Sequence, residues 1–204
     1  LDSQGVPHVA YNNDSTNQML YARKTGTVWS IETVETNLQA GDPVPGIALD
    51  GQGTPHLAYR NDLAGSGVLR HALRTNAAWL VTSVDVDDDA GYDAAIIING
   101  SGRPGIVSYH NSDSSAMFYH ESDGLTWDGT GIPVSGGAGR YASIALDGSG
   151  RLCISFNAAG DGDIRYISHD GSDWGTAQQV AVSGYSYTGL AFDGAGQPVI
   201  AYCG

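Results

Sequence analysis

The sequence predicts an all-β protein built from repeated four-stranded units, and three observations lead to this prediction. A short motif, in which an apolar residue precedes Asp or Asn and a Gly-containing turn, occurs five times at intervals of 46 to 49 residues. An aromatic or His residue followed eight positions later by Trp occurs four times. No segment shows the apolar period of about 3.6 residues that marks an amphipathic helix.

The repeated motif is a hairpin turn signal, because Asp, Asn and Gly tolerate the positive φ that tight turns require. Self-similarity with a period of about 20–50 residues indicates one supersecondary unit repeated along the chain. We therefore expect one domain over residues 1–204. Its repeats start near residues 1, 49, 98, 146 and 192, at Leu1, Leu49, Ile98, Leu146 and Phe192.

Each repeat is predicted to hold four strands, A to D. Strand A precedes the turn motif, strand B follows it, and strands C and D form the hairpin that carries the aromatic residue and the Trp. These pairs are Tyr21/Trp29, His71/Trp79, Tyr119/Trp127 and Tyr166/Trp174, and each Trp is expected to pack between units. Strand B alternates in side-chain size. Its larger face is Val9/Tyr11, Leu57/Tyr59, Val107/Tyr109, Ile154/Phe156 and Ile200/Tyr202.

Four-stranded meanders of about 45 residues stacked around an axis are the blades of a β-propeller. The sequence therefore predicts a β-propeller of four four-stranded blades of about 48 residues, plus a surplus C-terminal hairpin of strands A and B. In general layout the whole chain resembles repeat propellers of the NHL, sialidase-like and tachylectin-like kinds.

The predicted strand count leaves one strand B without a place. The first repeat lacks a strand A, and the C-terminus adds a fifth A and a fifth B. The chain would then be a closed four-bladed ring with an extra strand outside, a fragment of a larger propeller, or a subunit whose terminal hairpin inserts into another copy. The D strands at 127–134 and 174–182 carry almost no charge to guard an exposed edge, which favours intermolecular contacts.

Composition disfavours several classes of partner. The net charge of −13 argues against nucleic acid and anionic membranes, since phosphates are bound by Lys and Arg. No apolar run approaches the roughly 20 residues that cross a bilayer, so no membrane insertion is expected. The Gly-rich chain with a single lysine, Lys24, is typical of an extracellular or cell-surface protein.

The acidic segment at 85–93 has two interpretations. The carboxylates of Asp85, Asp87, Asp89 and Asp93, with a nearby Gly, resemble a calcium loop, because Ca²⁺ prefers several oxygen ligands on a tightly turning backbone. The Gly stands one position late and no bidentate Glu follows, so a solvated loop is the alternative. No other cofactor is expected.

Polar side chains follow strand B in successive repeats and could bind sugar hydroxyls once per blade. They are Asn13, Asp14, Asn61, Asp62, Asn111 and Asp113. The alternative is that each satisfies its own turn backbone.

The two cysteines lie on or just after strand B of the last two repeats. A disulfide between Cys153 and Cys203 would fix the terminal hairpin against the fourth blade and would suit an oxidising compartment.

The sequence contains no recognisable catalytic motif. Gly-x-Ser-x-Gly, His-Glu-x-x-His and a phosphate-binding Gly-rich loop are all missing. We therefore predict a protein that is not an enzyme, an extracellular assembly subunit whose terminal strands contact further copies in a homo-oligomer or filament. The alternatives are a lectin-like module that binds glycans and a fragment of a larger propeller.

Overall fold

The computed structural model describes residues 1–39, 44–63, 66–86, 89–121, 126–134, 139–158, 160–182 and 186–204. Every regular element in these ranges is a β-strand. In this part of the chain no helix has the length and apolar character needed to cross a membrane.

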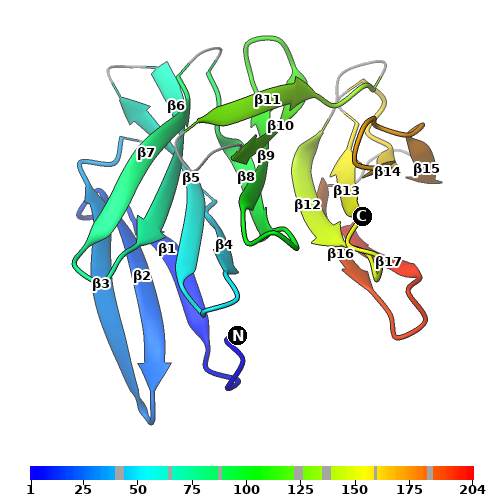
Figure 1. Cartoon of the computed structure of the whole chain (residues 1–204). Helices are drawn as coiled ribbons and strands as arrows, with labels where there is room; N and C mark the ends of the chain where they lie inside the picture. The colour runs from blue at the N-terminus through cyan, green and yellow to red at the C-terminus, as the bar shows by residue number, and fades with distance from the viewer. Residues whose placement is uncertain are drawn as a thin grey trace.

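The strands form five antiparallel sheets that follow one another along an arc (Figure 1). The first sheet has three strands, the next three have four each, and the last has two. The bounds in the first two sheets are β1 His8–Asn13, β2 Gln18–Thr25, β3 Val28–Thr36, β4 Gly46–Leu49, β5 Pro55–Leu63, β6 Ser66–Arg74 and β7 Trp79–Asp85. The others are β8 Tyr92–Ile98, β9 Pro104–His110, β10 Ser115–Glu121, β11 Trp127–Gly131, β12 Arg140–Leu146, β13 Leu152–Asn157, β14 Ile164–His169, β15 Gln178–Ala181, β16 Ser186–Phe192 and β17 Pro198–Cys203.

These sheets are the predicted blades. Strands β4, β8, β12 and β16 are the four described A strands, and each is joined by the turn motif to a strand B. The all-β fold of four-stranded blades with a C-terminal A–B hairpin is therefore confirmed, and the first blade lacks a strand A, as the strand count predicted.

The turn motif closes each A–B hairpin with side-chain hydrogen bonds. Oδ1 of Asp147 accepts the backbone N–H groups of Ser149 and Arg151, both at 2.9 Å. Gly150 adopts a φ of +82°, which favours glycine. Hydrogen bonds from the Ser149 hydroxyl and the Arg151 amide lower the pKa of Asp147 to about 2. The carboxylate thus stays ionised and holds the turn at neutral pH.

Trp side chains join neighbouring blades, as predicted. In the second, third and fourth blades, the Trp ring packs edge-on against an aromatic or His ring on strand C of the preceding blade. The pairs are Trp79–Tyr21 at 5.2 Å between centroids, Trp127–His71 at 5.1 Å and Trp174–Phe118 at 5.8 Å. Trp29 in the first blade is 44% exposed. No described blade precedes the first one to cover that ring.

The third blade departs from the predicted alternation by one residue. Val107 and Phe118 pack toward the fourth blade, whereas Ile106 and Tyr119 pack toward the second. The predicted equivalence of Val107 with Leu57 is therefore wrong. A slip of one residue in a strand moves every side chain to the opposite face. Phe118, and not Tyr119, faces the next blade as Tyr21 and His71 do.

The inner strands β4, β8, β12 and β16 follow one another along the inside of the arc (Figure 1). Strand β16 packs on β12 and β13 and pairs only with β17. Because no ladder between described strands joins β16 to β1, the interpretation as a closed four-bladed ring is wrong. The hairpin is instead a separate two-stranded sheet that packs on the fourth blade.

The predicted disulfide is also wrong, since both cysteines are free thiols. Cys153 is buried near the start of β13, where its Sγ accepts the Tyr166 hydroxyl at 3.0 Å. Cys203 is exposed at the end of β17. In equivalent B strands these positions differ by four residues, or about 13 Å of strand. A disulfide requires Cα atoms within about 7 Å.

Candidate functional site

The inner strands β8, β12 and β16 begin with the same unusual backbone conformation. Asp93, Tyr141 and Tyr187 have φ values of 51°, 56° and 51°. Each is the second residue of its strand, and the ladder shifts register there. A positive φ costs a residue other than glycine of order 1–3 kcal/mol and often marks a functional site. Three blades thus present one bulged side chain each from equivalent positions.

These bulges border a cavity of about 330 Å³, which we call the inner-strand pocket. Its lining includes Val44, Asp93, Tyr141, Ser143, Tyr187 and Thr188. The rings of Tyr141 and Tyr187 lie 4.3 Å apart between centroids with their planes at 36°. Because Tyr187 is 57% exposed, this ring pair offers an apolar surface to a ligand.

Asp93 supplies the carboxyl group of the pocket. Its side chain is 13% exposed, and its Oδ2 accepts the backbone N–H of Tyr141 at 3.3 Å. Nε of Arg140 lies 3.5 Å from the same oxygen. Burial raises the pKa of Asp93 and outweighs these two contacts, which lower it. The carboxyl group can accept hydrogen bonds from the hydroxyl groups of a ligand.

The guanidinium group of Arg140 lies among three tyrosine rings. Its Cζ is 5.5 Å from the ring centroids of Tyr92 and Tyr141 and 5.2 Å from that of Tyr109. These distances allow cation–π attraction, which reaches to about 6 Å. The rings hold Arg140 beside Asp93, next to the pocket. The lining of the pocket itself combines the aromatic pair with the polar side chains of Asp93, Ser143 and Thr188.

A buried arginine underlies this cluster. Arg60 is 5% exposed, and its Cζ lies 3.8 Å from the Tyr92 ring centroid. Its Nη2 pairs with Asp89 at 2.5 Å and Asp62 at 2.6 Å. Burial acts to raise the pKa of Asp89, but the hydrogen bond and charge of Arg60, with hydrogen bonds from Asn111 and Gly67, together lower it by more. Arg60, on the second blade, thus packs against Tyr92, one of the rings that surround Arg140.

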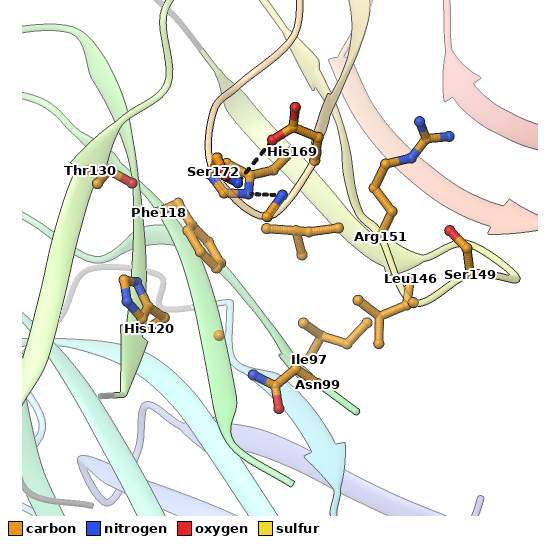
Figure 2. Close-up of a pocket in the computed structure, with 15 residues that line it drawn as sticks. Ile97, Asn99, Phe118, His120, Thr130, Leu146, Ser149, Arg151, His169 and Ser172 are labelled. Atoms are coloured by element: carbon orange, nitrogen blue, oxygen red, sulfur yellow. Dashed lines mark hydrogen bonds between the residues drawn. The ribbon is translucent and has the colours of Figure 1, made fainter. Parts of the chain in front are cut away.

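Two larger hollows lie at the opposite end of the inner strands, between blades. The first, about 570 Å³, separates the third and fourth blades, and we call it the 3/4 groove (Figure 2). The second, about 790 Å³, occupies the equivalent place between the first and second blades, and we call it the 1/2 groove. Apolar side chains of the 3/4 groove include Ile97, Phe118 and Leu146, and polar ones include Asn99, His120 and His169.

Neither a family model nor a curated protein sequence matches the chain. Solved structures do match it. They include a protein of unknown function from Dyadobacter fermentans, with a TM-score of 0.66 and 14% identity over 91% of this chain and 64% of that one. They also include an α-L-arabinofuranosidase from Lactobacillus brevis, with a TM-score of 0.61 and 11% identity over 98% and 80%. A leech intramolecular trans-sialidase has a TM-score of 0.62 and 17% identity over 91% and 33%.

This chain is a β-propeller. At these identities the likeness establishes the fold, and the chain spans 64% of the length of the Dyadobacter protein.

The prediction that the chain is not an enzyme is wrong. Two of these three neighbouring propellers are enzymes that act on glycosides, so enzymatic relatives share the fold. A local motif is a poor guide in this fold, because the lining of the inner-strand pocket comes from several blades, as Asp93, Tyr141 and Tyr187 show.

The described carboxylates of the predicted calcium loop contact different partners. The contacts are Asp85 with Tyr119, Asp89 with Arg60, and Asp93 with Arg140. Asp87 lies outside the described residues. In the described ranges no three His, Cys, Asp or Glu side chains gather as a metal site would require. Calcium binding stays a prediction.

The Asn and Asp residues after strand B form hydrogen bonds or ion pairs with other groups of the protein. Three of them accept hydrogen bonds within their own turn. Asn13 accepts one from the backbone N–H of Ser15, Asp14 one from Nδ2 of Asn12, and Asp113 one from the backbone N–H of Ser115. Asn61 is buried and accepts the N–H of Gln39, Asp62 pairs with Arg60, and Asn111 donates to Asp89. None of these six predicted residues lines the inner-strand pocket.

Sequence reasoning missed Arg140, Tyr141 and Tyr187. One signal was present, because alignment on the turn motif places Asp93, Tyr141 and Tyr187 in one column, six residues before the Asp or Asn of the turn. A column of large polar side chains at the start of an inner strand indicates residues that face the propeller interior.

Proposed function

We propose that this propeller binds glycans in the inner-strand pocket. The observation that carries the proposal is the exposed Tyr141–Tyr187 ring pair beside Asp93 and Arg140. An aromatic face suits the C–H side of a sugar ring, and the two charged groups suit its hydroxyls. The named activities of the arabinofuranosidase and the trans-sialidase on glycosides support this ligand class.

The first ligand to test is a neutral oligosaccharide that contains arabinose. The carboxylate of Asp93 in the pocket contacts the guanidinium of Arg140 beside the pocket, so the two charges largely cancel. A neutral ligand is accordingly a better match than a strongly charged one. Arabinose follows from the name of the Lactobacillus brevis neighbour.

Tyr187→Ala should weaken the binding of arabinotriose about tenfold, because the contact of an aromatic face contributes roughly 1.5 kcal/mol. Isothermal titration calorimetry measures the affinity. Tyr202→Ala is the matched control, since Tyr202 is also an exposed tyrosine but does not line the pocket. Equal affinities of the wild type and the Tyr187→Ala variant would contradict the proposal.

Self-association through open blade faces is a second candidate function. Trp29 and Ile31 on the first blade and Val199 on the last hairpin are exposed. Within the chain, Trp side chains at the position of Trp29 are covered by the neighbouring blade. We propose that a blade of another copy covers Trp29.

Light scattering across a concentration series tests this association. The wild type should exceed the chain mass of 21.2 kDa, and Trp29→Ser should restore that mass. A wild type that stays at the chain mass at every concentration excludes self-association.

A further inference from the structure

The 1/2 groove and the 3/4 groove are built from equivalent positions of the repeat. Strand pairing aligns Tyr21 with Phe118, since Tyr21 lies opposite Glu32 and Phe118 opposite Thr130. Arg74 lies opposite Trp79 as His169 lies opposite Trp174. The two grooves can therefore be compared residue by residue.

In the 1/2 groove an ion pair crosses from one blade to the next. Nε of Arg74 lies 2.6 Å from Oε2 of Glu32, and Nε1 of Trp79 donates to the same oxygen at 3.1 Å. His8 fills further space, with Nδ1 2.7 Å from the Tyr21 hydroxyl. The polar side chains of the 1/2 groove thus form hydrogen bonds and an ion pair with one another.

The 3/4 groove lacks these crossing groups. Thr130 stands in the place of Glu32, His169 in that of Arg74, and Gly105 in that of His8. A Cβ at Gly105 would lie 3.0 Å from Cε2 of Phe118, so glycine there lets the Phe118 ring lie against the strand. The groove is left open over an aromatic ring (Figure 2).

We propose that the 3/4 groove is a second glycan site, which binds a neutral sugar ring against Phe118. The ring of His120 lies 6.0 Å from that of Phe118 at 16° between planes, which extends the aromatic surface. Asn99, Thr130 and His169 add polar groups around it. A volume of about 570 Å³ falls in the usual range of small-molecule sites, and apolar walls with a few polar groups are typical of them.

Charge also favours a neutral ligand. The cation of Arg151 is paired through Nε with Asp147 at 2.9 Å. Asp170 in the lining adds a carboxylate, with Oδ1 held by the N–H groups of Ser172 and Asp173. The groove thus has no surplus positive charge for an anion.

The two sites are separate. Tyr141 of the inner-strand pocket and Leu146 of the 3/4 groove lie five residues apart on β12, which is about 17 Å of strand. The second site rests on the proposed function for its ligand class but uses other residues, so each can fail alone.

The test rebuilds the crossing ion pair of the 1/2 groove in the 3/4 groove. In the double variant Thr130→Glu, His169→Arg the new ion pair should cross the groove beside Phe118 and exclude a sugar ring from it, as the pair of Glu32 and Arg74 crosses the 1/2 groove. In calorimetric titrations with arabinotriose the wild type should bind two equivalents and the double variant one. Tyr187→Ala should still bind two equivalents, one of them about tenfold more weakly. Melting curves establish that the variants are folded.

A second variant tests the groove site in case the double variant does not fold. His120→Ala removes an exposed ring at the edge of the groove and should weaken only the groove site, by several-fold. Trp174 gives an independent signal, because its ring lies 5.8 Å from Phe118 and 4.9 Å from His169. Wild-type fluorescence should change on titration, and Trp174→Phe should remove most of that change.

The outcomes separate the two sites. The groove site alone is overturned if the wild type binds one equivalent and Tyr187→Ala weakens it, or if the double variant still binds two. The inner-strand pocket alone is overturned if the wild type binds one equivalent that Tyr187→Ala leaves unchanged and the double variant loses. No binding at millimolar arabinotriose overturns both.

Discussion

Replacement of Trp127 by alanine is expected to lower the free energy of unfolding by about 3 kcal/mol. The ring packs edge-on against His71 of the preceding blade, with centroids 5.1 Å apart, and against the core cluster that contains Leu69 and Ile106. Its removal leaves a cavity between two blades. For a chain of this size the melting temperature should fall by roughly 6–12 °C in a calorimetric scan.

Trp29→Ala is the matched control for this prediction. Trp29 occupies the same position in the first blade, where the ring is exposed and no described blade covers it. Its replacement should change the free energy of unfolding by less than about 1 kcal/mol when unfolding is measured at a protein concentration where the chain is monomeric. Equal losses at Trp127 and Trp29 would show that the Trp position stabilises a blade internally rather than joining two blades.

The blades could be predicted from the sequence because their signals are local and repeated. The Asp-Gly turn forms its hydrogen bonds within five residues, as Asp147 does, and therefore recurs wherever an A–B hairpin closes. The Trp position is also constant, since each blade must pack on its neighbour. In the third blade two adjacent apolar residues, Ile106 and Val107, both fit strand B. The turn motif selects Ile106, which lies seven residues after Asn99 as Leu57 lies seven residues after Asp50, and the packing against neighbouring blades agrees.

The inner-strand pocket could not be predicted in the same way. Asp93, Tyr141 and Tyr187 lie about 46–48 residues apart and meet only because three blades turn their inner strands toward one place. Each side chain is also aimed by a bulge with positive φ, and nothing in the types Asp or Tyr indicates that conformation. The acidic segment at 85–93 stands out in the sequence by the number of its carboxylates. Its described members instead form separate contacts with Tyr119, Arg60 and Arg140.

Arg60→Ala should cost about 3 kcal/mol of folding free energy, and it should also weaken glycan binding at the inner-strand pocket. Loss of one partner of a buried ion pair costs about 3–5 kcal/mol, and the lower end applies here because Asp62 and Asp89 are partly exposed. Arg23→Ala is the control, since its pair with Asp2 lies at the surface and should contribute about 0–1 kcal/mol. Urea denaturation measures both values.

Arg60→Ala should weaken glycan binding because Arg60 contacts the pocket indirectly, through Tyr92 and Arg140. Arg60 stacks on Tyr92 at 3.8 Å, and Tyr92 is one of the three rings that hold Arg140 beside Asp93. Without Arg60 the Tyr92 ring loses its packing partner, so Arg140 and the carboxylate should lose their fixed geometry. Calorimetry well below the melting temperature should then show weaker binding of arabinotriose in the pocket and unchanged binding in the 3/4 groove. If Arg60→Ala destabilises the fold but leaves both affinities unchanged, Arg60 supports the blades alone and the pocket is held by Arg140 and its own neighbours.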